Sequence, residues 1–227
     1  MKEKILLSWS GGKDSAMALY EIQKGRNYDI SALLTTITDD YDRISIHGVR
    51  RVLLEQQAKS LGLPLQKALI PKDSTNEIYE SRINAVLANH KEEGIDSVAF
   101  GDLFLEDIKK YREAHLGKIG MRGLFPIWHR DTTELLNTFL QLGFKAIIVC
   151  VNLKMLDGSF AGKTIDGKFL DELPSNIDPC GENGEFHSFV FDGPIFDEEV
   201  KFTLGETVVR NDACFCDLLP ADLNAQF

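Results

Sequence analysis

Short apolar runs alternate with longer stretches of helical periodicity over the first two thirds of the chain. Several short runs are apolar throughout, which is typical of strands buried on both faces, as in a parallel sheet. A glycine follows each longer stretch, where a helix commonly ends. The predicted strands are residues 5–9, 30–35, 65–70, 97–100 and 145–151, and the predicted helices are residues 14–24, 49–61, 76–93, 103–116 and 132–142. This alternation predicts a doubly wound α/β fold with a mainly parallel sheet, whose ligand crevice lies at the carboxyl ends of the strands.

The pattern changes after residue 151, where glycines lie among Asp, Asn and Pro. Loops are expected to dominate there, before two further strands at residues 201–210 and 213–219. We therefore predict two domains. The first is an α/β domain over residues 1–128, and the second is a smaller α+β substrate-binding domain over residues 129–227.

Composition narrows the class of protein. The chain has 227 residues, of which 44% are hydrophobic and 26% are charged, and its formal net charge is −10. It can bury a core and is neither fibrous nor disordered. The acidic balance disfavours a broad phosphate-binding surface, so we expect no DNA partner and regard RNA as unfavoured.

No apolar run approaches the ~20 residues that span a bilayer, so we expect no membrane partner and a cytoplasmic location. The four cysteines are too few for a disulfide scaffold and are expected to be reduced.

The first predicted strand leads into a glycine turn and then a helix, with the sequence SWSGGKDS at residues 8–15. Strand, glycine turn and helix N-terminus form an anion-binding arrangement, because the free amides and the helix dipole point at the ligand. The hydroxyls of Ser10 and Ser15 and the ammonium of Lys13 can add contacts. An ordinary turn capped by Ser10 or Asp14 is the alternative.

The glycine–lysine pairs at residues 12–13 and 162–163 do not fit a Walker loop. The pattern G-x-x-x-x-G-K-[ST] needs glycine and Ser or Thr where this chain has Leu7 and Asp14. A second candidate, GKT at residues 162–164, has its preceding glycine, Gly158, one residue too close. No predicted strand leads directly into it.

The hexapeptide SGGKDS at residues 10–15 resembles the signature of the PP-loop ATP pyrophosphatases, which split ATP into AMP and pyrophosphate while adenylating a substrate. The resemblance implies an adenine nucleotide α-hydrolase-like fold, with residues 1–128 as a PP-loop ATP-binding domain. The residues implied to bind the pyrophosphate end of ATP are Ser10, Gly11, Gly12, Lys13, Asp14 and Ser15, and those implied to lie beside adenine are Leu34, Thr35 and Thr36.

Further segments, spread over nearly the whole chain, resemble the diphthine–ammonia ligase family. They are SIHGVR at 45–50, GD at 101–102, DI at 107–108, PIW at 126–128, GK at 162–163 and GENGEFHSFVFDGP at 181–194. The resemblance implies a ligase that adenylates a carboxylate with ATP and amidates it with ammonia. The implied acceptor is diphthine on elongation factor 2. Members also occur in organisms that make no diphthamide, so another carboxylate remains open, as does a homodimer.

Two acidic residues are candidate ligands for Mg²⁺. Asp102 follows the strand at residues 97–100, so its carboxylate is expected at the crevice, where it could bind Mg²⁺ together with Asp14. The alternative for Asp102 is an N-cap of the helix at residues 103–116. Gly101 and His47 are assigned to ATP binding, although a lone histidine is often structural.

The glycine-rich segment before residue 188 supplies the remaining candidates. Without the resemblance it is a solvated turn that leads into a strand; with it, we predict binding of substrate or ammonia. The residues assigned to substrate are Gly181, Glu182, Gly184, Glu185 and Lys163, and those assigned to catalysis are Lys13, Asp14, Ser15, Glu185 and His187.

Two other functions stay open. A PP-loop enzyme that modifies tRNA, by thiolation or lysidine formation, would use the same nucleotide domain, and Cys180 would be compatible with sulfur transfer. A non-catalytic ATP-binding sensor resembling the universal stress proteins would share the sheet topology. Salt-sensitive binding of tRNA would support the first alternative, and ATP bound without turnover would support the second.

Overall fold

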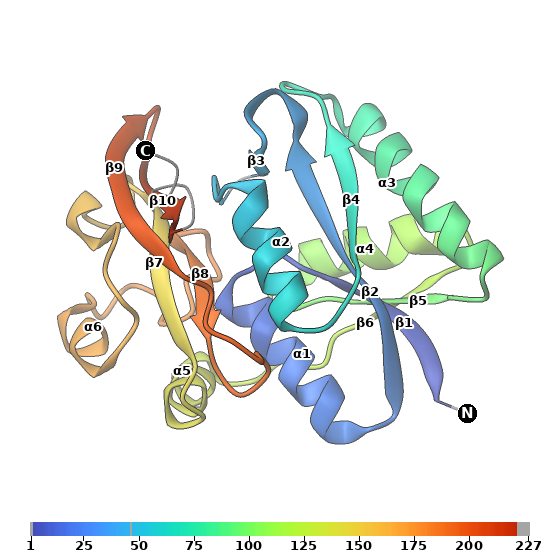
Figure 1. The fold of residues 1–227 in the computed structure, drawn as a ribbon, viewed down its shortest axis with the longest axis horizontal. Helices are drawn as coiled ribbons and strands as arrows, with labels where there is room; N and C mark the ends of the chain where they lie inside the picture. The colour runs from blue at the N-terminus through green and yellow to red at the C-terminus, as the bar shows by residue number, and fades with distance from the viewer. Residues whose placement is uncertain (1, 46, 222–227) are drawn as a thin grey trace.

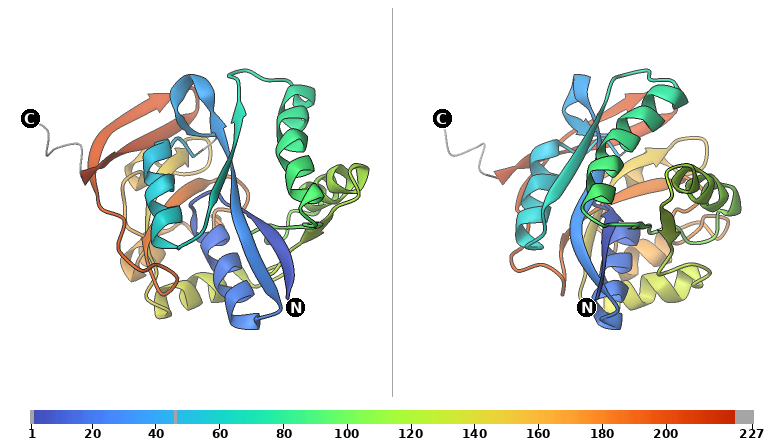
Figure 2. Two further views of the ribbon diagram at one scale, coloured as in Figure 1. Left: turned by 45° about the vertical axis from the view of Figure 1, so that its right-hand side comes forward. Right: turned by 90° about the vertical axis from the view of Figure 1, so that its right-hand side faces the viewer.

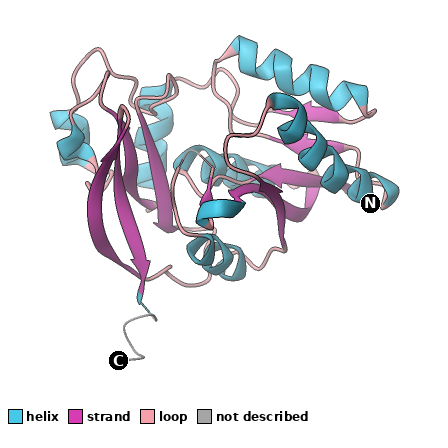
Figure 3. Cartoon of the chain, turned by 90° about the horizontal axis from the view of Figure 1, so that it is seen from above, coloured by secondary structure: helices cyan, strands magenta, loops and turns pink. Residues whose placement is uncertain are grey.

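The computed structural model describes residues 2–45 and 47–221; residues 1, 46 and 222–227, the last of which end the predicted second domain, lie outside it. Two sheets and the helices around them make up the described chain (Figure 1). Seen from other directions, the sheets are separate layers rather than one continuous sheet (Figures 2 and 3).

The first sheet comes from the N-terminal half and is mainly parallel. Its strands are β1 (Glu3–Ser8), β2 (Tyr28–Thr38), β3 (Arg43–Ile44), β4 (Leu65–Ile70), β5 (Ser97–Ala99) and β6 (Arg122–Leu124). β1 pairs in parallel with β2 and β5, β4 with β2, and β6 with β5, whereas β3 runs antiparallel to the end of β2. The strand order β3-β2-β1-β5-β6, with β4 beside β2, confirms the predicted doubly wound fold. The short strand β6 was not predicted.

Helices cover both faces of this sheet. α1 (Lys13–Gly25) and α2 (Arg51–Ser60) lie between the two sheets, and α3 (Asn76–Glu92) and α4 (Glu106–Lys118) lie on the opposite face (Figure 1). Under α3 and α4 the side chains of Leu6, Leu34, Leu87, Val98, Phe100 and Leu116 form a separate apolar cluster. The two faces of the sheet therefore have separate cores.

The second sheet is antiparallel and belongs to the C-terminal part of the chain. Its strands are β7 (Lys145–Asn152), β8 (Phe186–Asp192), β9 (Phe202–Arg210) and β10 (Ala213–Pro220), in the order β8-β7-β10-β9. The helices of this part are α5 (Thr132–Gln141) and α6 (Gly167–Glu172), and the short 3₁₀ helices of the chain are η1 (Asp39–Tyr41) and η2 (Gly158–Phe160). The prediction of a smaller α+β C-terminal domain is confirmed.

The strand at residues 145–151 corrects one expectation. Its apolar sequence predicts a place among the parallel strands, but β7 pairs antiparallel with both β8 and β10. Residues Ala146 to Val151 are all buried. Burial on both faces shows only that a strand is covered on both sides, and it does not show which sheet the strand joins.

One apolar core joins the two sheets through α1. Leu7 on β1, Met17 on α1, Leu136 on α5, Ile147 on β7 and Phe189 on β8 belong to the same buried cluster. The predicted boundary near residue 128 therefore separates two sheets that share a core.

Two helices begin or end away from their predicted limits. α2 begins at Arg51 because Val49 still accepts a hydrogen bond from the backbone of Ile44 at 2.8 Å. α4 runs from Glu106 through Gly117, which was expected to end the helix but is helical. Within the described ranges, no helix has both the length and the apolar character needed to cross a bilayer.

Candidate active site

The glycine turn lies between β1 and α1, at the carboxyl edge of the first sheet. Gly11 has a φ of +76°, and a Cβ there would lie 2.7 Å from Oε1 of Gln57, so only glycine fits. Gly12, which has no side chain to cap the helix, is the N-cap of α1. The Oγ of Ser15 donates to the carbonyl of Gly12 at 2.8 Å and lies 3.3 Å from Oγ of Ser10. The turn therefore presents helix amides and two hydroxyls, as an anion-binding loop does.

A buried glutamine on α2 fixes the position of this turn. The amide of Gln57 accepts a hydrogen bond from Nε1 of Trp9 at 2.9 Å and donates to the carbonyls of Gly11 at 3.0 Å and Val190 at 2.6 Å. Sequence analysis did not single out Gln57, because a helical glutamine is usually exposed. The sequence does carry one signal for the burial of Gln57. It lies four residues after the buried Leu53, and that spacing places both side chains on the apolar face of α2.

A cavity of about 230 Å³ lies beside the turn. Ser10, the end of β2 from Leu34 to Thr36, and His47 line it together, so the structure brings together three segments that the sequence assigned to ATP. The other wall comes from β5, α3 and α4 and includes Tyr79, Ile83, Leu87, Val98, Phe100, Tyr111, Arg112 and His115. The cavity is smaller than the ~300–1,000 Å³ typical of drug-sized ligands, so it suits a base and sugar with the phosphates outside it.

Lys13 connects the turn to the C-terminal domain. Its side chain is buried, and Nζ donates to Oδ2 of Asp14 at 2.8 Å and to the carbonyl oxygen of Cys180. The backbone amide of Lys13 donates to Oγ of Ser188 on β8 at 3.2 Å. Burial, the largest influence, would by itself lower the pKa of Lys13, but the carboxylate of Asp14 acts against it together with other nearby groups, and the net shift of the pKa is upward. The ammonium therefore stays charged at the junction of the two domains.

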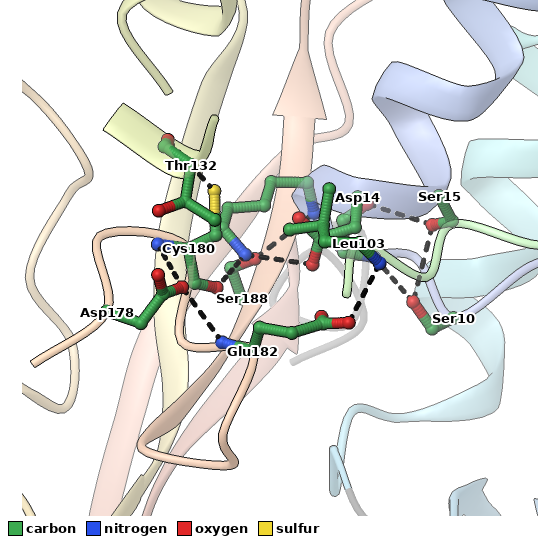
Figure 4. A network of polar contacts seen from close by, with 11 residues as sticks. Ser10, Asp14, Ser15, Leu103, Thr132, Asp178, Cys180, Glu182 and Ser188 are labelled. Atoms are coloured by element: carbon green, nitrogen blue, oxygen red, sulfur yellow. Dashed lines mark hydrogen bonds and ion pairs between the residues drawn. The ribbon is translucent and has the colours of Figure 1, made fainter. Parts of the chain in front are cut away.

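The glycine-rich segment of the second domain closes over the turn (Figure 4). Oε1 of Glu182 accepts a hydrogen bond from the backbone amide of Leu103 at 2.8 Å. Asp178 holds the segment by accepting from the amides of Cys180 at 2.9 Å and Glu182 at 3.2 Å. Burial, reinforced by the nearby carboxylate of Asp14, raises the pKa of Glu182 to about 7. A carboxyl that can exchange a proton near neutral pH thus lies beside the turn.

Two histidines from different domains stack against each other. The rings of His47 and His187 are 4.5 Å apart with an interplanar angle of 28°. Burial lowers the pKa of His47 to about 3, with a contribution from His187. Burial also lowers the pKa of His187 to about 4, with a contribution from Lys13. Both rings are therefore neutral at neutral pH.

The two candidate magnesium ligands have different surroundings. Oδ1 of Asp14 is buried and has no hydrogen-bond partner among the described residues, which leaves it free for a cation. Oδ2 of Asp102 lies 2.6 Å from Nε of Arg112, so its charge is already balanced. Gly101 packs directly on α1, since a Cβ there would lie 2.7 Å from the carbonyl carbon of Asp14. Over residues 2–45 and 47–221, no group of three or more His, Cys, Asp or Glu side chains is placed to hold a metal ion.

The remaining candidates lie apart from the nucleotide cavity. Nζ of Lys163 is paired with Glu172 at 2.5 Å, and the structure does not bring it to the turn. Glu185 is buried, and its Oε1 accepts from the backbone amide of Asp178 at 3.1 Å, which braces the glycine-rich segment. Gly181 has a φ of +68°, and a Cβ there would lie 2.9 Å from the carbonyl oxygen of Phe186. These residues shape the segment around Glu182.

A larger groove of about 1550 Å³ lies between the first sheet and strands β9 and β10. His47, His187 and Gly184 line it, and His47 also lines the nucleotide cavity. Arg43 and Arg50 line the N-terminal side, and both donate to the carboxylate of Asp217 on β10, at 2.8 and 2.6 Å. The histidine pair therefore stands where the groove and the cavity meet.

A glycine turn at a helix N-terminus, beside a cavity at the carboxyl edge of a doubly wound sheet, is the arrangement of an α/β fold of the PP-loop class. Two protein-family models match the chain, one over each domain. The family model of the diphthamide synthase N-terminal domain matches residues 1–123, and that of the diphthamide synthase C-terminal domain matches residues 131–222.

Individual relatives agree with the family models. The diphthine–ammonia ligase of Schizosaccharomyces pombe is 26% identical over 238 residues, which cover 95% of this chain but 38% of that protein. The diphthine–ammonia ligases of Danio rerio and Homo sapiens are 26% and 25% identical over 91% of this chain, and the matches cover 89% and 85% of those proteins.

The chain belongs to the diphthine–ammonia ligase family, which is the family of the diphthamide synthase domains. The predicted family and the predicted class of enzyme, a ligase that forms a carbon–nitrogen bond, are confirmed.

Proposed function

We propose that this protein uses ATP to join ammonia to a substrate carboxylate, releasing AMP and pyrophosphate. In the first step a carboxylate oxygen bonds to the α-phosphorus as pyrophosphate leaves. In the second step the ammonia nitrogen bonds to the acyl carbon as AMP leaves, and the nitrogen gives up a proton. The observation that carries the proposal is the junction of the anion-binding turn, the cavity and the glycine-rich segment of the second domain at one place.

The turn supports the first step. Amides at the start of α1, apart from that of Lys13, which donates to Ser188, would bind phosphate oxygens together with the hydroxyls of Ser10 and Ser15. The charged Lys13 stands beside them and would stabilise the charge that develops on pyrophosphate. The cavity between Leu34 and Phe100 would hold the nucleoside end, so that the phosphates lie over the turn.

Asp14 fits the role of a magnesium ligand, because its buried Oδ1 lacks a partner among the described residues. Mg²⁺ in such sites takes one or two carboxylates besides phosphate oxygens, and when bound it neutralises phosphate charge. Asp102 could join it only by sharing its carboxylate with Arg112. The role of Asp102 stays a prediction.

The glycine-rich segment supports the second step. It covers the turn and would keep water away while ammonia approaches. Glu182, with its pKa near 7, could accept the proton that nitrogen loses. The neutral rings of His47 and His187 stand where an acceptor in the groove would meet the nucleotide.

The groove supports a carboxylate carried on a larger molecule. At about 1550 Å³ it exceeds the ~300–1,000 Å³ of common small-molecule sites, and it leads to the histidine pair. Since the relatives are named diphthine–ammonia ligases, diphthine on a protein is the first candidate acceptor. Another carboxylate, a cytoplasmic location and a homodimer remain predictions.

The test is to incubate the protein with ATP, Mg²⁺, ¹⁵N-ammonium and candidate carboxylates, among them a diphthine-bearing protein. We expect AMP and pyrophosphate in equal amounts and ¹⁵N in the product amide. Asp14→Asn should lower turnover at least 100-fold. It should also lower the melting temperature, because it removes the partner of the buried Lys13 ammonium, so turnover is compared at a temperature where both proteins are folded. The matched control, Asp29→Asn at an exposed position near the start of β2, should keep full turnover.

Other products would contradict the proposal. Formation of ADP, or ATP bound without turnover in the presence of every acceptor, would count against an adenylating ligase. Tight binding of tRNA that weakens steeply with salt would favour the tRNA-modifying alternative.

A further inference from the structure

The cavity beside the glycine turn contains polar atoms that the fold leaves without partners. Neither ring nitrogen of His115, which lines the cavity, makes a hydrogen bond to the described residues. His115 is 7% exposed. Buried polar groups are rarely left unpaired, so a ligand with polar atoms is expected beside His115.

His115 is held in place from one side. It lies on α4, and its Nδ1 is 3.5 Å from Oε2 of Glu80 on α3. Glu80 is itself fixed by the hydroxyl of Tyr111, which donates to Oε1 at 3.1 Å. The carboxylate of Glu80 thus stands beside one ring nitrogen of His115, and Nε2 remains for a ligand.

Apolar side chains of one buried cluster line the cavity on the side of α3 and α4, among them Leu34, Ile83, Leu87 and Phe100. The nearby cation, Arg112, is paired with Asp102 at 2.6 Å and lies over the ring of Phe100 at 4.3 Å. A phosphate would therefore meet apolar walls and a guanidinium already in use, and an alkyl chain would leave His115 unsatisfied. A flat ring with apolar faces and a polar edge satisfies both requirements.

We propose that His115 determines base specificity, by hydrogen-bonding the edge of a purine ring that lies between Leu34 and the α3–α4 wall. The inference rests on the proposed function, because it takes the bound nucleotide to be ATP. It adds a residue from α4 that no sequence motif marked.

The test is a comparison of binding affinities by calorimetry, without any acceptor carboxylate. The probes are ATP, 7-deaza-ATP, purine riboside triphosphate and inorganic tripolyphosphate, which has no base. His115→Leu should weaken ATP about tenfold, since one hydrogen bond is lost, and should leave tripolyphosphate unchanged. His115→Gln, which keeps a donor and an acceptor, should stay within about threefold of wild type.

Two controls separate recognition from folding. His90→Leu changes a histidine on α3 that does not line the cavity, and it should leave all four affinities unchanged. Either 7-deaza-ATP or purine riboside triphosphate, whichever lacks the base atom that His115 contacts, should bind wild type more weakly than ATP does. This difference in affinity should vanish in His115→Leu, because the variant no longer contacts that atom.

The outcomes also distinguish this inference from the function on which it rests. The role of His115 is wrong if wild type and His115→Leu bind ATP equally well. It is also wrong if His115→Leu loses as much affinity for tripolyphosphate as for ATP. In both cases the ligase proposal stands. If wild type binds neither ATP nor tripolyphosphate, the proposed function fails, and this inference fails with it.

Discussion

The amide of Gln57 makes three hydrogen bonds that fix the anion-binding turn, to Trp9, Gly11 and Val190. Gln57→Leu keeps the approximate size of the side chain but leaves the buried Nε1 of Trp9 without its partner and removes one hydrogen bond each from the carbonyls of Val190 and Gly11, the second of which still accepts from the amide of Val190 at 2.8 Å. We expect a loss of about 3 kcal/mol in the free energy of unfolding, measured with urea, because each unpaired buried group carries a penalty of ~1–3 kcal/mol.

Affinity for ATP should fall as well in Gln57→Leu, since the turn loses its support. Gln141→Leu, at the exposed end of α5, is the matched control and should stay within ~0.5 kcal/mol of wild type. A Gln57→Leu protein of wild-type stability and affinity would contradict the bracing role.

The stacked histidines predict how stability depends on pH. The folded-state pKa values, about 3 for His47 and about 4 for His187, lie below the usual value of ~6.5. The pair therefore stabilises the fold above pH 6.5, and this contribution is lost as the pH falls toward 4, because unfolding then takes up protons.

His187→Phe keeps an aromatic ring stacked against His47 but removes the titrating imidazole of His187. We expect chemical denaturation to show that wild type loses more stability than the variant between pH 7 and pH 5, by roughly 2 kcal/mol. Equal losses in the two proteins would show that His187 is not held neutral by the fold.

At the scale of elements, the end of β5 packs on the start of α1 without room for a side chain. A Cβ at Gly101 would lie 2.7 Å from the carbonyl carbon and 2.8 Å from the carbonyl oxygen of Asp14. Gly101→Ala should therefore push α1 away from β5, lowering stability by ~1–3 kcal/mol and ATP affinity with it.

The matched control is Gly117→Ala on α4, where nothing lies within 4 Å of an added Cβ. Alanine suits a helix better than glycine, so this variant should gain up to ~1 kcal/mol. Thermal melts of the two variants should shift in opposite directions, and a shift in the same direction would contradict the close packing of Gly101.

At the scale of the whole molecule, the two sheets share one core through α1. We expect the full chain to unfold in a single cooperative transition, with equal calorimetric and van't Hoff enthalpies. A fragment of residues 1–128 would expose the side of α1 that packs on β8, and it should show no cooperative transition by itself. Two separate transitions in the full chain would show that the domains are energetically independent.

Much of the fold followed from local sequence. The helices and the parallel strands were predicted because their periodicity is a property of a few consecutive residues. The antiparallel pairing of β7 was not predicted and β6 was missed, because strand pairing depends on partners that are distant in the sequence.

The site divides in the same way. The sequence by itself determined the glycine turn at residues 10–15 and its place at a helix N-terminus, since a strand, a glycine turn and a helix are set by a few consecutive residues. Tertiary structure decided that His47 stacks on His187, that Gln57 holds the turn, and that His115 lines the cavity beside it. Each of these contacts joins residues from separate elements, and only the packing of those elements brings them together.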